Sequence, residues 1–264
     1  MQTVIVTVIL LGVIGLLIGL MLVYANEAFR VEKDPKEVAV REVLPGNNCG
    51  ACGRAGCDDM AKAIASGAAP ANGCPVGGAP VAAKIGAIMG VQVEASTPKA
   101  AYVKCAGDCN KAVNNKHYVG PRTCEAAASV AGKGDKACQF GCLGFGSCMA
   151  VCEFGAITMV NGIAHVDRSK CKACGRCVAT CPQHLIELVP EPALYTVACS
   201  NKDKGPSVKK NCASGCIACG MCTRQCENGA ITVNANIAHI DYDKCQNCGK
   251  CAAKCPMKAI EVRG

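Results

Sequence analysis

The chain has 264 residues, of which 25 are cysteines, 3% are aromatic and none is tryptophan, and its formal net charge is +8. Dense cysteine in a short secreted chain is typical of a disulfide scaffold, but spacings of two and three residues are too tight and repetitive for one. We therefore expect a reducing compartment. So few aromatic side chains also leave a folded domain of this chain short of conventional core.

The N-terminal part contains an apolar run from Val4 to Tyr24 without a charged side chain. At about 1.5 Å per residue, a helix of this length would span about 30 Å, the thickness of a bilayer's hydrocarbon core. Nothing basic precedes the run and no small-residue cleavage motif ends it. Residues 1–25 are therefore predicted to be a transmembrane anchor in contact with membrane lipid, and not a signal peptide.

A charged connector is expected over residues 26–48. Basic side chains follow the apolar run and none precedes it, which predicts a single pass with the C-terminal side in the cytoplasm. These side chains are Arg30, Lys33, Lys36 and Arg41.

A first cysteine domain is expected over residues 49–80, and residues 81–104 read as a linker rich in Ala, Gly and Val. Four cysteines suffice for one closed four-iron site. The domain has the pattern C-x2-C-x4-C-x16-C-P, formed by Cys49, Cys52, Cys57, Cys74 and Pro75.

The remaining chain repeats itself at a constant offset. The segment from Phe154 to Cys171 matches the segment from Asn228 to Cys245. In the first copy Asn161-Gly162 joins two alternating apolar stretches, which predicts a β-hairpin. We expect two tandem modules of hairpins and short helices, residues 105–190 and 191–264, and an α+β fold overall.

Each module ends in the C-x2-C-x2-C-x3-C-P run of bacterial ferredoxins, in which the fourth cysteine ligates the other cluster. Zinc ribbons need two cysteine pairs, so this run favours a cubane cluster. In the first module the predicted ligand sets are Cys171, Cys174, Cys177 with Cys152, and Cys181 with Cys148, Cys142 and Cys138. In the second module they are Cys245, Cys248, Cys251 with Cys226, and Cys216, Cys219, Cys222 with Cys255.

Cys138 enters the first module's set because Phe145 stands where a middle cysteine is usual. This allocation gives five four-iron clusters and leaves Cys105, Cys109, Cys124, Cys199 and Cys212. The segment Cys105-x3-Cys109-x14-Cys124 could hold a sixth cluster if another ligand, such as Cys138, joined it; otherwise these thiols are free or structural. Five clusters with their thiolates would bring the net charge to about −2, so the basic composition says little about partners. We expect no nucleic-acid partner.

The order of these parts, from the expected anchor through the Cys49 to Cys74 domain to tandem ferredoxin modules, resembles the iron–sulfur B component of the Rnf electron transport complex. The resemblance covers essentially the whole chain, although the second module and the Cys105 to Cys124 segment match only the longer members. It implies a membrane complex that oxidises reduced ferredoxin, passes electrons to NAD⁺ and exports sodium or protons. The B component would receive electrons from soluble ferredoxin and relay them to membrane and flavin- or NAD-binding subunits.

The motifs found in the sequence agree with a protein that relays electrons. No G-x-G-x-x-G after a strand, no P-loop and no nucleophile with its base is found, so we expect no catalytic residue, flavin or NAD on this chain. Enzyme activity would belong to the whole oxidoreductase. Two alternatives are a membrane polyferredoxin that serves a hydrogenase or a corrinoid-protein system, and a cysteine-rich zinc-binding protein without a redox role.

Overall fold

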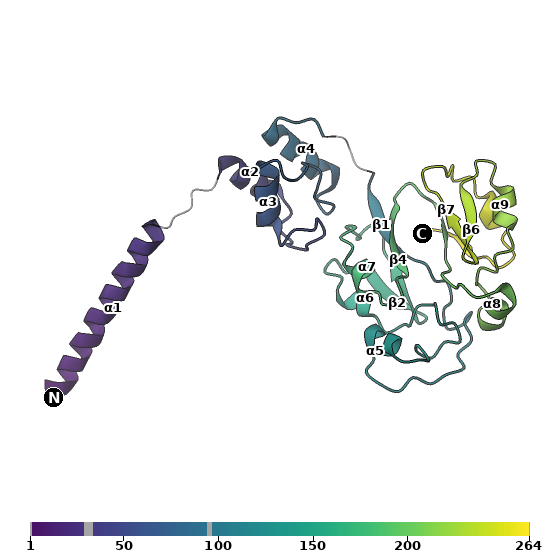
Figure 1. Ribbon diagram of the computed structural model, residues 1–264, viewed down its shortest axis with the longest axis horizontal. Coiled ribbons are helices and arrows are strands. Elements are labelled where there is room, and N and C mark those ends of the chain that lie inside the picture. Colours follow the sequence, from purple (N-terminus) through teal and green to yellow (C-terminus); the bar gives the residue numbers. More distant parts are fainter. Residues whose placement is uncertain (1, 29–33, 94–96, 264) are drawn as a thin grey trace.

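The computed structural model describes residues 2–28, 34–93 and 97–263. Figure 1 shows a long N-terminal helix, then a helical domain, then two modules of strands and short helices, which agrees with a mixed helix and strand fold.

Helix α1 (Gln2–Ala28) covers the apolar run, but the prediction of a transmembrane helix there is wrong. Within the described ranges, no helix combines the length and apolarity that crossing a membrane requires. The prediction rested on helical rise and on the absence of charge, and these two conditions are necessary for a span without being sufficient. Arg30 and Lys33, on which the orientation also rested, lie outside the described residues.

The helical domain packs three helices around one small core. They are α2 (Pro35–Val43), α3 (Cys57–Ala65) and α4 (Gly78–Met89). Asp34 caps α2 by accepting a hydrogen bond from the Lys36 backbone N–H at 2.8 Å. Val40, Ile64 and Ile85, one from each helix, are at most 2% exposed and share the core. Helix α4 reaches into the stretch expected to be a linker, and its packing makes it part of this domain.

The first module contains two antiparallel pairs of strands. Its elements are β1 (Lys99–Val103), α5 (Cys124–Ser129), α6 (Ser147–Ala150), β2 (Ile157–Val160), β3 (Ile163–Val166), α7 (Arg176–Thr180) and β4 (Ile186–Pro190). Strand β1 pairs with β4, and β2 with β3. Asn161 and Gly162 join β2 to β3 with φ of 47° and 75°, the left-handed pair that a two-residue hairpin turn requires. The predicted hairpin is present.

The second module repeats this arrangement. Its elements are β5 (Tyr195–Val197), α8 (Gly205–Asn211), α9 (Met221–Gln225), β6 (Ile231–Asn234), β7 (Ile237–Ile240), α10 (Lys250–Ala253) and β8 (Ile260–Val262). Strand β5 pairs with β8, and β6 with β7. Both β2 and β3 recur as β6 and β7 at the offset of the sequence repeat, with the same register.

Side chains late in the sequence bind the second module to the first. Arg263 donates hydrogen bonds to the backbone oxygens of Pro190 at 2.8 Å and Ala193 at 3.2 Å, and it is only 5% exposed. Tyr242 donates a hydrogen bond to Glu187 of β4 at 3.3 Å. One nitrogen of this buried guanidinium makes both hydrogen bonds, and it would lose them if the modules separated, so the contact favours the two modules packing as one unit.

Substituting Ile85→Ala should lower the free energy of unfolding of the helical domain by about 2–5 kcal/mol, because it removes a fully buried side chain from a packed core. Lys84→Ala is the control, since Lys84 lies on the exposed face of the same helix. Urea unfolding followed by circular dichroism measures both. Equal effects of the two substitutions would mean that α4 is a linker helix that does not belong to this core.

Candidate cysteine-lined metal centres

The 25 cysteines are all free thiols, and many of them gather around common cavities. Four cavities in the described part of the chain are each lined by four cysteines, and each leaves about 350 to 390 Å³ of empty space, counting the part open to solvent. We name the four groups set II (Cys152, Cys171, Cys174, Cys177), set III (Cys124, Cys142, Cys148, Cys181), set IV (Cys216, Cys219, Cys222, Cys255) and the interface set (Cys105, Cys138, Cys199, Cys212).

Sets II and IV bring together the residues that the spacing predicted. In set II the backbone N–H of Ala101 donates a hydrogen bond to the Cys171 sulfur at 3.4 Å. In set IV the backbone N–H of Ala259 donates to the Cys255 sulfur at 3.3 Å. Because N–H donors stabilise sulfur as thiolate, these contacts suit metal-bound cysteine.

Set III differs from the prediction in one member. Cys142, Cys148 and Cys181 lie together as expected, but Cys124 completes the group and Cys138 lines another cavity. Cys124 begins helix α5, and its backbone N–H donates a hydrogen bond to the Ser147 hydroxyl at 3.0 Å at the start of α6. This contact fixes α5 beside the other thiols of the set.

A length difference between the modules could have revealed Cys124. The stretch from Cys105 to Cys138 is more than twice as long as the stretch from Cys199 to Cys212, so the first module carries an insertion. Cys124 lies in this insertion and compensates for Phe145, which stands at the place that a cysteine of set IV occupies in the second module. Phe145 contacts Tyr118 instead, with ring centroids 5.5 Å apart.

The interface set contains one predicted ligand, Cys138, one residue considered for a further cluster, Cys105, and two that the spacing left unassigned. Cys109, also considered for a further cluster, is exposed and lines none of the four cavities.

Two further predicted groups are set I (Cys49, Cys52, Cys57, Cys74) and set V (Cys226, Cys245, Cys248, Cys251). In set I, burial raises the pKa of Cys74, and the charges of Cys57 and Cys52 add to that shift. In set V, burial raises the pKa of Cys251, and Cys245 and Cys248 act in the same direction. Three members of each set are therefore electrostatic neighbours: Cys52, Cys57 and Cys74 in set I, and Cys245, Cys248 and Cys251 in set V.

The buried thiols would stay protonated if nothing replaced the proton. Burial raises the pKa of Cys148 to about 12, and the charge of Cys142 adds to the shift. Burial likewise raises the pKa of Cys177 to about 11. A metal ion displaces the proton and compensates the thiolate charge, so such sites bind metal while releasing protons.

These sets fit iron–sulfur clusters by their chemistry. Four sulfurs around one apolar cavity, with backbone N–H groups aimed at them, are what a four-iron cluster requires. No group of three or more His, Cys, Asp or Glu side chains in residues 2–28, 34–93 and 97–263 is arranged to hold a single metal ion.

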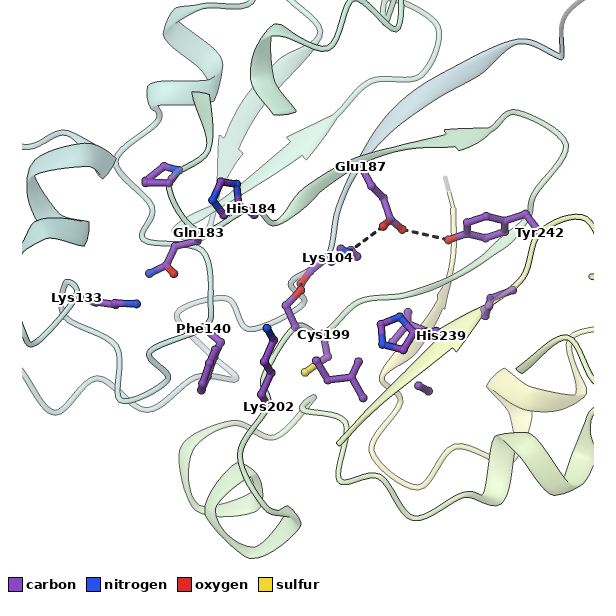
Figure 2. Close-up of a pocket in the computed structure, with 16 residues that line it drawn as sticks. Lys104, Lys133, Phe140, Gln183, His184, Glu187, Cys199, Lys202, His239 and Tyr242 are labelled. Carbon is purple, nitrogen blue, oxygen red and sulfur yellow. Dashed lines mark hydrogen bonds and ion pairs between the residues drawn. The ribbon is translucent and has the colours of Figure 1, made fainter. Parts of the chain in front are cut away.

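Figure 2 shows a cleft between the two modules, with about 1250 Å³ of empty space by the same measure. Glu187 lies between Lys104, at 2.9 Å, and the Tyr242 hydroxyl, at 3.3 Å. Cys199 and Phe140 line both this cleft and the cavity of the interface set. The interface set therefore lies next to the junction of the modules.

Three parts of the chain match family models. Residues 44–76 match a putative Fe-S cluster domain, residues 163–186 a 4Fe-4S binding domain and residues 215–259 a 4Fe-4S dicluster domain. These ranges contain set I, most of set II and all of sets IV and V.

Curated relatives cover nearly the whole chain. The B component of the Na(+)-translocating ferredoxin:NAD(+) oxidoreductase complex of Acetobacterium woodii is 45% identical over 98% of this chain and 78% of its own length. The B component of the ion-translocating oxidoreductase complex of Methanosarcina acetivorans is 40% identical over 95% of each chain. The B component of the proton-translocating ferredoxin:NAD(+) oxidoreductase complex of Clostridium ljungdahlii is 42% identical over 99% of this chain and 93% of its own length. This chain belongs to the family of B components of Rnf-type ion-translocating oxidoreductase complexes.

Proposed function

We propose that this chain is the iron–sulfur subunit that takes electrons from reduced ferredoxin and relays them to the partner subunits of a ferredoxin:NAD⁺ oxidoreductase. Sets I to V would each hold one four-iron cluster, and such clusters would supply one-electron transfer. The observation that carries the proposal is the succession of cysteine sets from the second module to the helical domain, together with the relatives' names.

Electrostatic interactions between neighbouring sets support a continuous path from the first module to the helical domain. Cys177 of set II is among the thiols whose charge acts on Cys148 of set III. Burial raises the pKa of Cys174 in set II, and the charge of Cys49 in set I adds to it. Sets III, II and I are therefore close enough to influence one another, and the path leads toward the helical domain.

The protein's own groups exclude water and orient the sulfurs. Cys148 and Cys177 are each 8% exposed, and apolar side chains such as Ile157 and Leu185 surround them. The Leu185 backbone N–H points at the Cys181 sulfur at 3.5 Å. Burial and N–H···S contacts are the means by which a protein sets the potential of a cluster.

Electrons would enter at the second module. In sets I to V the exposed cysteines are Cys219 and Cys248, which belong to sets IV and V. Arg224 and Lys254 are exposed nearby in sequence, and neither forms an ion pair within the described residues. A basic surface beside exposed cluster ligands suits an acidic electron carrier such as ferredoxin.

The chain would work on the cytoplasmic side of a membrane, held there by its partners in the complex. NAD⁺ reduction and the export of sodium or protons would be carried out by other subunits, including flavin- or NAD-binding ones. The relatives' names differ in the ion, which supports assigning ion choice to the complex.

The purified chain should be reduced by reduced ferredoxin but should not reduce NAD⁺ until its partner subunits are added, because a relay without a nicotinamide site cannot transfer hydride. Visible bleaching of the clusters and NADH absorbance distinguish the two steps. NADH formation by the isolated chain would contradict the relay assignment.

Cys124→Ala should remove between about one and about four irons per chain, since it deletes one ligand of set III. Cys109→Ala should leave iron content unchanged, because Cys109 is exposed and outside every cavity described above. Iron analysis and electron paramagnetic resonance of the reduced proteins measure the effect. An unchanged spectrum in the Cys124 variant would restore Cys138 as the ligand.

The double substitution Arg224→Glu and Lys254→Glu should slow reduction by ferredoxin about tenfold at low salt and weaken its salt dependence, because it reverses two charges near Cys219 and Cys248. Lys62→Glu on α3 is a matched control far along the chain from sets IV and V. Stopped-flow reduction measures the rates. Equal slowing in all variants would mean that ferredoxin docks on a different surface of the chain.

A further inference from the structure

Lys136 places a positive charge inside the first module. It is 8% exposed, and it donates hydrogen bonds to the backbone oxygens of Gly107 at 3.0 Å, Cys142 at 2.9 Å and Gly162 at 2.9 Å. A lysine amine has three donors only when it is protonated, so three carbonyl acceptors require the charged form. No carboxylate in the described part of the chain forms an ion pair with it. The first module therefore buries a cation without an acidic partner.

This charge lies beside set III. Cys142, whose carbonyl accepts one of the three hydrogen bonds, belongs to set III and packs in the same core as Cys148. Burial raises the pKa of the Cys142 thiol, and the charge of Lys136 opposes that shift. Lys136 also lines the cavity of the interface set, but the cysteine to which it donates a hydrogen bond is the one in set III. A nearby cation stabilises the more negative state of its neighbour, and for a metal site this is the reduced state.

The second module has no buried charge at the equivalent position. The offset of the sequence repeat relates Lys136 to Lys210, just as it relates Cys142 to Cys216 of set IV. Lys210 stands in the last turn of α8 and is exposed. Water and salt screen an exposed ammonium far more than a buried one. The same residue type therefore has different electrostatic effects in the two modules.

The structural part of the role of Lys136 does not need a charge. In the first module Lys136 ties the turn of the β2–β3 hairpin, at Gly162, to the loop after β1, at Gly107. In the second module Asn236, in the turn of the β6–β7 hairpin, donates a side-chain hydrogen bond at 2.9 Å to the backbone oxygen of Lys202, in the loop after β5. A neutral amide thus joins the equivalent turn to the equivalent loop. The positive charge is what Lys136 adds to this tie.

We propose that the buried ammonium of Lys136 gives set III a higher reduction potential than set IV, and that this difference favours electron transfer from the second module to the first. The step is the transfer of one electron, in which the second module is oxidised and set III is reduced. Lys136 acts through Cys142 and is a positioning residue, not a ligand. The inference rests on the proposed function and adds a direction to it.

Redox titration of the anaerobically purified full chain, followed by electron paramagnetic resonance, measures the midpoint potentials. Lys136→Gln keeps amide donors and removes the charge, so it should lower the midpoint potential of the set III signal by about 59 mV, a tenfold change in a one-electron equilibrium. Lys210→Gln, at the equivalent position, is the matched control and should shift no signal. Lys136→Arg keeps the charge and should restore the potential of the wild type.

Two further variants assign the signals. Cys148 and Cys222 occupy equivalent positions in sets III and IV, so the signal altered by Cys148→Ala belongs to set III and the one altered by Cys222→Ala to set IV. In the wild type the set III signal should have the higher midpoint potential. The reverse order would overturn the inference even if Lys136→Gln did not fold, a failure that loss of iron would reveal.

The remaining outcomes separate the inference from the proposed function. An unchanged set III signal in an iron-replete Lys136→Gln variant, or a shift confined to signals that Cys148→Ala leaves intact, would overturn the role of Lys136. Normal reduction by ferredoxin in that case would leave the proposed function standing. A wild type that a chemical reductant reduces with set III above set IV, but that ferredoxin does not reduce, would contradict the function and support the effect of Lys136 on potential.

Discussion

Burial of cysteine sulfur among apolar side chains is the constraint on which the two modules depend. In the first module Cys142 and Cys148 pack in one core with Val103 and Ile157. Cys222 and Cys251 pack similarly in the second module. Such thiols lose protons only when a cation replaces them, since burial raises their pKa. We therefore expect folding and metal binding to be coupled in each module, with clusters contributing the packing that aromatic side chains contribute in other small domains.

Duplication explains most of the architecture, and divergence after duplication explains the exceptions. The hairpins β2–β3 and β6–β7 have the same register at the repeat offset. The first module has Phe145 where the second has Cys219, and Cys124, within an insertion, lines its cavity instead. The Ser147 hydroxyl accepts a hydrogen bond from the Cys124 N–H and holds α5 beside the other thiols of set III, and Thr123 caps this helix.

Cysteine spacing and turn residues predicted the features formed by residues close together in the sequence. They did not predict the ligand groups whose members are far apart in the sequence. The turn at Asn161-Gly162 and the grouping of sets II and IV follow from residues within one module at fixed spacing. Cys124 could not be chosen over Cys138, because the decision depends on how an insertion folds back. The interface set was equally hidden, since its members from the two modules correspond at two different offsets, one of which only the strand register reveals. The transmembrane prediction was wrong because it counted charge and length alone.

Arg263, which follows all the cysteines in the sequence, bears on the order of biosynthesis. The ribosome synthesises the chain from the N-terminus to the C-terminus, so Cys105 and Cys138 leave the ribosome well before Cys199 and Cys212. The first module can acquire its own clusters while the second is still being translated, but two of the interface thiols must wait. Arg263 reaches Pro190 and Ala193 only after every thiol has been made, and it then holds the modules together. The contact of Arg263 with Pro190 and Ala193 can therefore join the modules only after both have been translated.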